Sequence, residues 1–72
     1  MSASTRSLLV NGAPRELAAD TVAEVLVALG IAPERPSIAV AVDGAIVARR
    51  AWTETPVADG QRLEIITAQA GG

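Results

Sequence analysis

Three Asn-Gly or Asp-Gly dipeptides constrain the fold of this chain more than any other feature of its sequence. Asn11-Gly12 follows a short apolar run, and Asn-Gly is the pair most favourable to a two-residue type I′ hairpin turn. Asp43-Gly44 follows a segment of alternating large and small apolar residues, and Asp59-Gly60 precedes another alternating segment. The sequence therefore predicts short strands between tight turns, at 7–10, 13–17, 38–42, 45–48 and 61–67.

The predicted strands differ in the faces they present. Pro14 cannot donate to a ladder, so strand 13–17 is expected at a sheet edge. In the last strand, Leu63 and Ile65 share one face. The opposite face of that strand carries Arg62, Glu64 and Ile66.

One amphipathic helix is predicted between the two hairpins. Thr21 and Glu24 form a T-x-x-E capping box, and Gly30 is placed to end the helix in a left-handed conformation. The helix shows a single apolar stripe at i, i+3, i+4 and i+7, formed by Val22, Val25, Leu26 and Leu29. Val27 falls off the stripe and is expected to be partly exposed.

The order hairpin, helix, hairpin, strand predicts an α+β fold of the β-grasp, or ubiquitin-like, type. We expect a mixed sheet of four to five strands with the helix across one face, in a single domain spanning 1–72 and ending in a flexible tail, 68–72. Segment 32–36 is a rigid connector, 49–56 has at most a helical turn, and Trp52 plugs the core edge. The stripe is expected to pack on Leu8, Val10, Ile38, Val40, Leu63 and Ile65. The other face is left uncovered, with a small apolar patch of Leu9, Ala39, Ala41 and Ile66.

Composition excludes most catalytic and nucleic-acid-binding functions. The 72 residues include no Cys, His or Tyr, so ordinary zinc sites and Cys-His or Ser-His nucleophiles are excluded. A formal net charge of −2 argues against a nucleic-acid partner. The apolar run 8–10 is too short for a signal-peptide core or membrane span, so no membrane association and a cytoplasmic location are expected. All cations are Arg, so the chain offers no lysine for isopeptide bonds.

The sequence ends in Gly71-Gly72, which makes the terminal carboxylate a candidate reactive group. Paired glycines have no β-carbon, so this end, together with Ala70, is suited to threading into a narrow enzyme cleft. A carboxylate becomes electrophilic once an adenylyl group is attached to it. Glycines also collect in frayed termini, which is the alternative explanation.

The chain resembles the ThiS family, the bacterial ubiquitin-like sulfur carriers of thiamin thiazole biosynthesis. Segments 9–17, 21–26 and 38–44 look like the family's opening hairpin, helix and central strand. The most specific stretch is a spaced set of residues near the C-terminus: Arg49, Trp52, Thr55-Pro56, Asp59-Gly60, Leu63-Glu64-Ile65 and Gly71-Gly72.

The resemblance implies a protein substrate and not an enzyme. In such carriers an E1-like adenylyltransferase uses ATP and Mg²⁺ to adenylate the terminal carboxylate, here that of Gly72. A sulfur-donor enzyme then converts it to a thiocarboxylate, and the sulfur passes to thiazole synthase. No cofactor is expected on this chain itself.

Three alternatives keep the fold and change the function. The chain could be the small subunit of molybdopterin synthase or a carrier for another sulfur pathway. It could be a ubiquitin-like modifier that forms amide bonds with target lysines. It could also be a plain binding module with an inert tail.

A surface for the activating enzyme is predicted on the uncovered face beside the last strand. Ile66 would supply an apolar contact, and Arg62 or Glu64 polar ones, with Leu9 nearby. The alternative is that Ile66 packs locally against Leu9.

Overall fold

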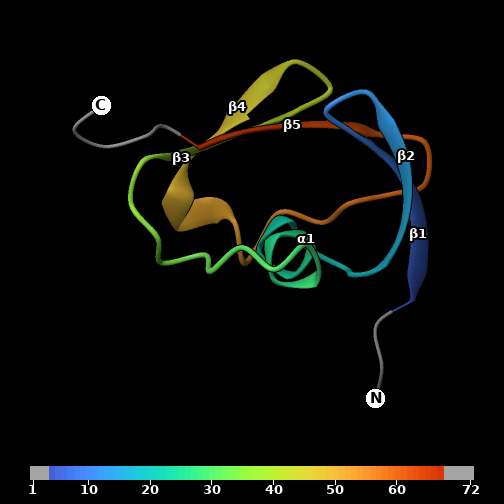
Figure 1. Cartoon of the computed structure of the whole chain (residues 1–72), viewed down its shortest axis with the longest axis horizontal. Helices are drawn as coiled ribbons and strands as arrows, with labels where there is room; N and C mark the ends of the chain where they lie inside the picture. Colours follow the sequence, from blue (N-terminus) through green and yellow to red (C-terminus); the bar gives the residue numbers. More distant parts are fainter. Residues whose placement is uncertain (1–3, 68–72) are drawn as a thin grey trace.

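The computed structural model describes residues 4–67, and the sheet it forms has five strands. Helix α1 (Val22–Ala28) lies across one face of this sheet (Figure 1). The strands are β1 (Thr5–Val10), β2 (Ala13–Ala18), β3 (Ile38–Val42), β4 (Ala45–Val47) and β5 (Arg62–Thr67), and a 3₁₀ turn, η1, covers Arg49–Ala51. The predicted α+β, β-grasp fold is confirmed; β3 has the predicted bounds, and the other strands differ from theirs by one or two residues.

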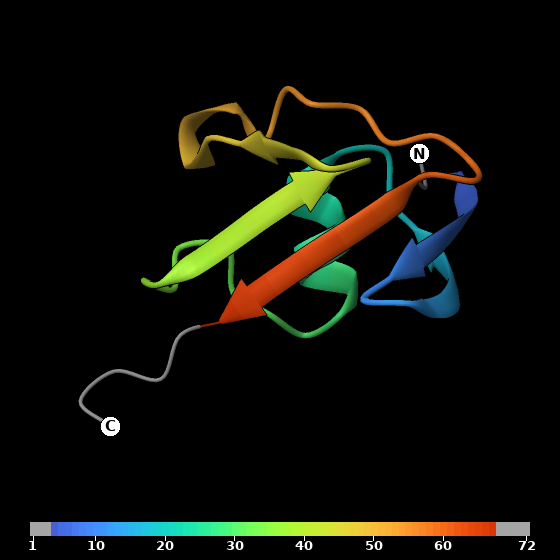
Figure 2. The same cartoon turned by 90° about the horizontal axis from the view of Figure 1, so that it is seen from above.

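The sheet is mixed and has the order β2-β1-β5-β3-β4. β1 pairs parallel to β5, and the three other pairings are antiparallel. Figure 2 shows β3 and β5 side by side in front of α1, which lies behind them. Pro14 is in the edge strand β2, as predicted, where its missing N–H costs no ladder bond.

Both predicted two-residue hairpin turns have the backbone that their residues favour. Asn11 and Gly12 have φ of 51° and 83°, and Asp43 and Gly44 have φ of 50° and 86°. Positive φ at both central positions is the mark of a type I′ turn, whose twist matches that of the flanking strands.

The helix begins and ends at the predicted residues. The Thr21 hydroxyl accepts from the Glu24 N–H at 3.2 Å, and the Glu24 carboxylate accepts from the Asp20 N–H at 2.7 Å. Beyond the C-terminal residues of α1, Gly30 has φ of 81°, and the Ile31 N–H donates to the Leu26 carbonyl at 2.8 Å. This Schellman pattern satisfies carbonyls that a helix end leaves free.

The core lies between α1 and the sheet and contains all six strand residues that were predicted to pack on the helix: Leu8, Val10, Ile38, Val40, Leu63 and Ile65. Leu26 and Val25 are fully buried, Leu29 is partly buried, and Val27 is 62% exposed, as expected. Trp52 is buried and donates from Nε1 to the Val47 carbonyl at 2.9 Å. The sequence analysis did not identify three further core residues, Leu17, Ala19 and Val57.

The prediction is wrong for one residue of the uncovered sheet face, Ala41, which was expected to be exposed. Ala41 is only 7% exposed, although it lies on the sheet face away from α1. Its cross-strand neighbours are Ile46 and Glu64, whose longer side chains flank the small methyl group on both sides. The predicted tail, 68–72, lies outside the described residues.

Candidate functional site

The candidate site is the face of the sheet that α1 does not cover, which we call the open face. β5 carries Arg62, Glu64 and Ile66 on this face, because Leu63 and Ile65 point into the core. The parallel register sets Leu9 opposite Arg62, and the antiparallel register sets Ala39 opposite Ile66. The four predicted contact residues therefore lie on two adjacent strands.

These four residues line one depression. Its volume is about 450 Å³, and it is bounded by Leu9, Arg62, Glu64 and Ile66 together with Asn11, Gly12 and Leu63. Ile66 is 65% exposed and Leu9 36%. Because Leu9 pairs with Arg62, four residues before Ile66, Ile66 gains little shelter from Leu9. An exposed isoleucine beside two opposite charges suits a protein contact.

Sequence reasoning missed Ile46, the most exposed large apolar residue in the described part of the chain. It is 76% exposed and pairs with Ala41, so it projects from the open face. The signal was present in the sequence, because a two-residue turn at Asp43-Gly44 sets Ala41 directly opposite Ile46. The apolar part of the open face thus extends from β1 to the edge strand β4.

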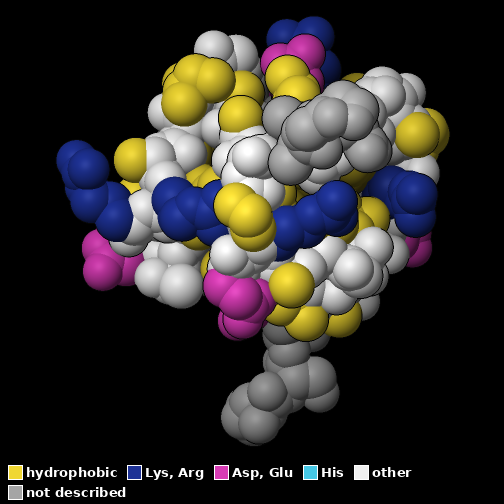
Figure 3. Space-filling view, turned by 60° about the vertical axis from the view of Figure 1, so that its left-hand side comes forward, with side chains coloured by type: hydrophobic (Ala, Val, Ile, Leu, Met, Phe, Trp, Pro, Cys, Tyr) yellow, Lys and Arg dark blue, Asp and Glu magenta, His cyan; other side chains and the backbone are white. Residues whose placement is uncertain are grey.

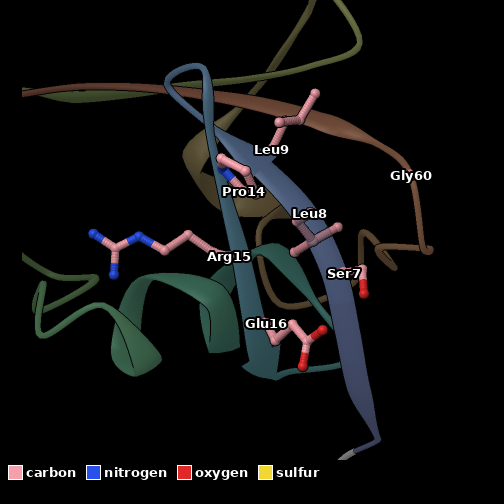
Figure 4. Close-up of a pocket in the computed structure, with 7 residues that line it drawn as sticks. All are labelled: Ser7, Leu8, Leu9, Pro14, Arg15, Glu16 and Gly60. Atoms are coloured by element: carbon pink, nitrogen blue, oxygen red, sulfur yellow. The ribbon is translucent and has the colours of Figure 1, made fainter.

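A second depression, of about 490 Å³, lies on the β1–β2 hairpin (Figure 4). Leu9 and Pro14 lie side by side at one end, as their cross-strand register requires, and Ser7 and Glu16 lie at the other. Arg15 points away from these side chains. Leu9 lines both depressions, so it joins the hairpin surface to that of β5.

Arg49 and Trp52 form a structural contact on another side of the molecule. The Arg49 guanidinium lies 4.6 Å from the centroid of the Trp52 ring. It donates to the carbonyl oxygens of Pro33 and Arg35, the latter at 2.8 Å. Figure 3 brings the side with η1 forward and shows arginine side chains in a row across it. Arg49 thus joins η1 to the connector before β3.

No metal-ligand cluster occurs among residues 4–67, since no three of their His, Cys, Asp or Glu side chains lie together. Within the same residues, no helix is long and apolar enough to cross a membrane. The predicted reactive end, Gly72 with Gly71 and Ala70, lies outside the described residues and follows β5 in sequence after two further residues.

Comparison with known proteins decides the family. The ThiS family profile matches residues 8–72. This chain belongs to the ThiS family. A search of curated proteins found no match.

Two solved structures from Geobacter metallireducens agree with this membership. One is a crystal structure of thiamine biosynthesis protein (ThiS), with 33% sequence identity and a TM-score of 0.74 over 92% of this chain and 99% of that one. The other is a solution structure of a thiamine biosynthesis protein, with 32% identity and a TM-score of 0.73 over 92% and 87% of the two chains. The ThiS match extends from β1 through the open face to the last residue of the sequence.

Proposed function

We propose that this protein is a cytoplasmic sulfur carrier of thiamin biosynthesis that bears sulfur as a thiocarboxylate on Gly72. The observation that carries the proposal is the match to the ThiS family over 65 of the 72 residues (8–72), including the final Gly71-Gly72. The similarity to two structures described as thiamine biosynthesis proteins supports the same pathway.

The chemistry requires activation before sulfur transfer. A carboxylate resists nucleophiles because of its charge and resonance. In the proposed first step a Gly72 carboxylate oxygen attacks the α-phosphorus of ATP and pyrophosphate leaves. In the second, a sulfur nucleophile attacks the acyl carbon and AMP leaves. When that nucleophile is a persulfide of the sulfur-donor enzyme, the acyl disulfide so formed is attacked by a thiol at the donor's sulfur, which releases the Gly72 thiocarboxylate and leaves a disulfide.

The catalytic groups are proposed to belong to partner proteins. An E1-like adenylyltransferase would bind ATP and Mg²⁺, a sulfur-donor enzyme would supply the sulfur, and thiazole synthase would receive it. This division fits a chain that contains no His and no Cys. The carrier itself would act as a protein substrate and bind no cofactor.

Intact-mass analysis tests the proposal directly. The protein is incubated with the activating enzyme, ATP, Mg²⁺ and a sulfur source. We expect its mass to rise by the difference between a sulfur and an oxygen atom, and only when ATP is present. Covalent adducts with lysines of other proteins would instead identify a ubiquitin-like modifier, and an unchanged mass would contradict both functions.

The open face is proposed to hold the activating enzyme while the residues after β5 enter its active site. Ile66 supplies an exposed apolar contact one residue before the end of the last strand, and Arg62 and Glu64 flank the same depression. A partner that binds here contacts the body of the carrier next to its reactive end.

Replacement of Ile66 by Asp is expected to weaken binding to the activating enzyme at least tenfold, because it places a charge in an apolar contact. Since Ile66 is 65% exposed, the free energy of unfolding is expected to fall by no more than about 1 kcal/mol. Titration calorimetry and urea denaturation measure the two effects.

Val27→Asp is the matched control, because Val27 is similarly exposed, at 62%, and lies on α1, across the core from the open face. It is expected to bind normally. A large loss of stability in Ile66→Asp, with normal binding of the folded fraction, would show that Ile66 packs locally and is not a contact residue.

A further inference from the structure

The side chain of Asn11 makes an unusual pair of hydrogen bonds across the sheet. Its Oδ1 accepts from the Ile65 N–H at 2.8 Å, and its Nδ2 donates to the Ile65 carbonyl at 3.1 Å. The Asn11 backbone N–H also donates to the Leu63 carbonyl at 2.9 Å. One residue in a hairpin turn therefore makes three hydrogen bonds to β5.

The two side-chain bonds continue the β1–β5 ladder after β1 has ended. In a parallel pair, the Ile65 N–H and carbonyl would bond to a carbonyl and an N–H of two residues of the adjacent strand, the ones on either side of its partner residue. At that position the chain has already turned away at Asn11-Gly12, and β1 ends at Val10. A carboxamide carries both an acceptor and a donor, so the Asn11 side chain supplies the carbonyl and the N–H that the backbone of a continuing β1 would have offered to Ile65.

Without this contact, the end of β5 would be paired on one side only. The strand pairing of β5 with β1 covers Leu9 and Val10 opposite Arg62 and Leu63, whereas its pairing with β3 runs to Thr67. Asn11 and Thr67 also line one depression, of about 400 Å³, between the hairpin and the end of α1. The carboxamide thus acts beside the point where the chain leaves the sheet.

We propose that Asn11 is a positioning residue, whose carboxamide fixes the end of β5 and so sets where Ile66 and the reactive end are presented to the activating enzyme. This inference rests on the proposed function for its partner, whereas the hydrogen bonds to Ile65 do not depend on it. Asn11 does not touch the reacting atoms and acts through β5.

Two variants separate this role from that of the turn. Asn11→Gly keeps a residue that readily adopts the positive φ of 51° and removes the whole carboxamide. Asn11→Asp also tolerates that conformation but sets a carboxylate oxygen against the Ile65 carbonyl. Val22→Ala serves as the control for stability, because Val22 is fully buried at the start of α1, outside the sheet, and its N–H donates to the Thr55 carbonyl and not to β5.

Hydrogen exchange tests the local contact. In Asn11→Gly, the Ile65 amide is expected to exchange about tenfold faster, the change that corresponds to one hydrogen bond. The Ile66 amide faces β3, since amides alternate along a strand, and is expected to change less. Equal acceleration of every β5 amide, or none, would overturn the inference.

Adenylation kinetics test the functional part. With the carrier as the varied substrate, both Asn11 variants are expected to raise KM about three- to tenfold with a smaller change in kcat, because they weaken ground-state docking. Val22→Ala, compared while fully folded, is expected to leave KM unchanged. KM values equal to the control would overturn the inference, whereas a wild-type chain that is never adenylated would refute the proposed function and leave the exchange result standing.

Discussion

Deletion of Gly72 is expected to abolish adenylation, with pyrophosphate exchange falling to the background of the activating enzyme alone. The deletion moves the terminal carboxylate one residue toward β5, which shortens the reach of the chain by about 3.3–3.6 Å. A near-attack geometry tolerates far less displacement than this, since misplacement by about 1 Å can cost a hundredfold in rate. ATP–pyrophosphate exchange at saturating ATP measures the effect.

Gly72→Val tests the same residue without shortening the chain. The β-branched side chain of valine restricts φ, and its bulk makes the chain too wide for a cleft that a glycine would pass through. The described core residues lie between Leu8 and Ile65, so circular dichroism is expected to show a folded protein in both variants. A wild-type rate of ATP–pyrophosphate exchange in either variant would disprove the role of Gly72. Loss of the folded circular dichroism signal would show that the fold depends on Gly72.

The features predicted correctly from sequence are those that neighbouring residues determine. Asn11-Gly12 and Asp43-Gly44 adopt the turns that their own backbone preferences favour. Thr21 and Gly30 bound the helix because capping depends on residues within one turn of it. The alternation of buried and exposed residues along β5 likewise places Leu63 and Glu64 on opposite faces of the sheet, and it depends on the strand alone.

The features that sequence reasoning missed depend on contacts between distant residues. Val57 stands alone in an irregular segment, and its burial accompanies a hydrogen bond from its N–H to the Asp20 carbonyl at 3.0 Å. Asn11 was recognised as a turn residue, but its bonds to Ile65 span 54 positions. No local pattern reports such pairings, because they follow from the strand order β1-β5-β3.

The candidate site divides in the same way. Leu9, Arg62, Glu64 and Ile66 were predicted together because alternation assigns β5 residues to faces, and the structure brings all four to one depression. Ala41 was assigned to the correct face, but its exposure depends on the neighbouring strands, which alternation within β3 does not describe. To place Ile46 on the open face, the register of the β3–β4 hairpin is needed, and the two-residue turn at Asp43-Gly44 determines that register.

Replacement of Leu26 by Ala is expected to lower the free energy of unfolding by roughly 2–5 kcal/mol. Leu26 is fully buried at the centre of the helix stripe, so truncation leaves a cavity between α1 and the sheet. At roughly 0.05–0.15 kcal/mol per residue, a 72-residue chain has a total stability of only about 4–11 kcal/mol. This single cavity therefore removes a large part of it.

The neighbouring residue provides the matched control for this prediction. Val27→Ala lies one position further along α1, is 62% exposed, and exchanges a β-branched residue for a better helix former. Its free energy of unfolding is expected to change by less than about 0.5 kcal/mol. Urea denaturation of both variants gives the comparison, with the midpoint falling in Leu26→Ala and nearly unchanged in Val27→Ala. Equal midpoints in the two variants would mean that the helix does not bury the face on which Leu26 lies, and that the core assigned between α1 and the sheet is wrong.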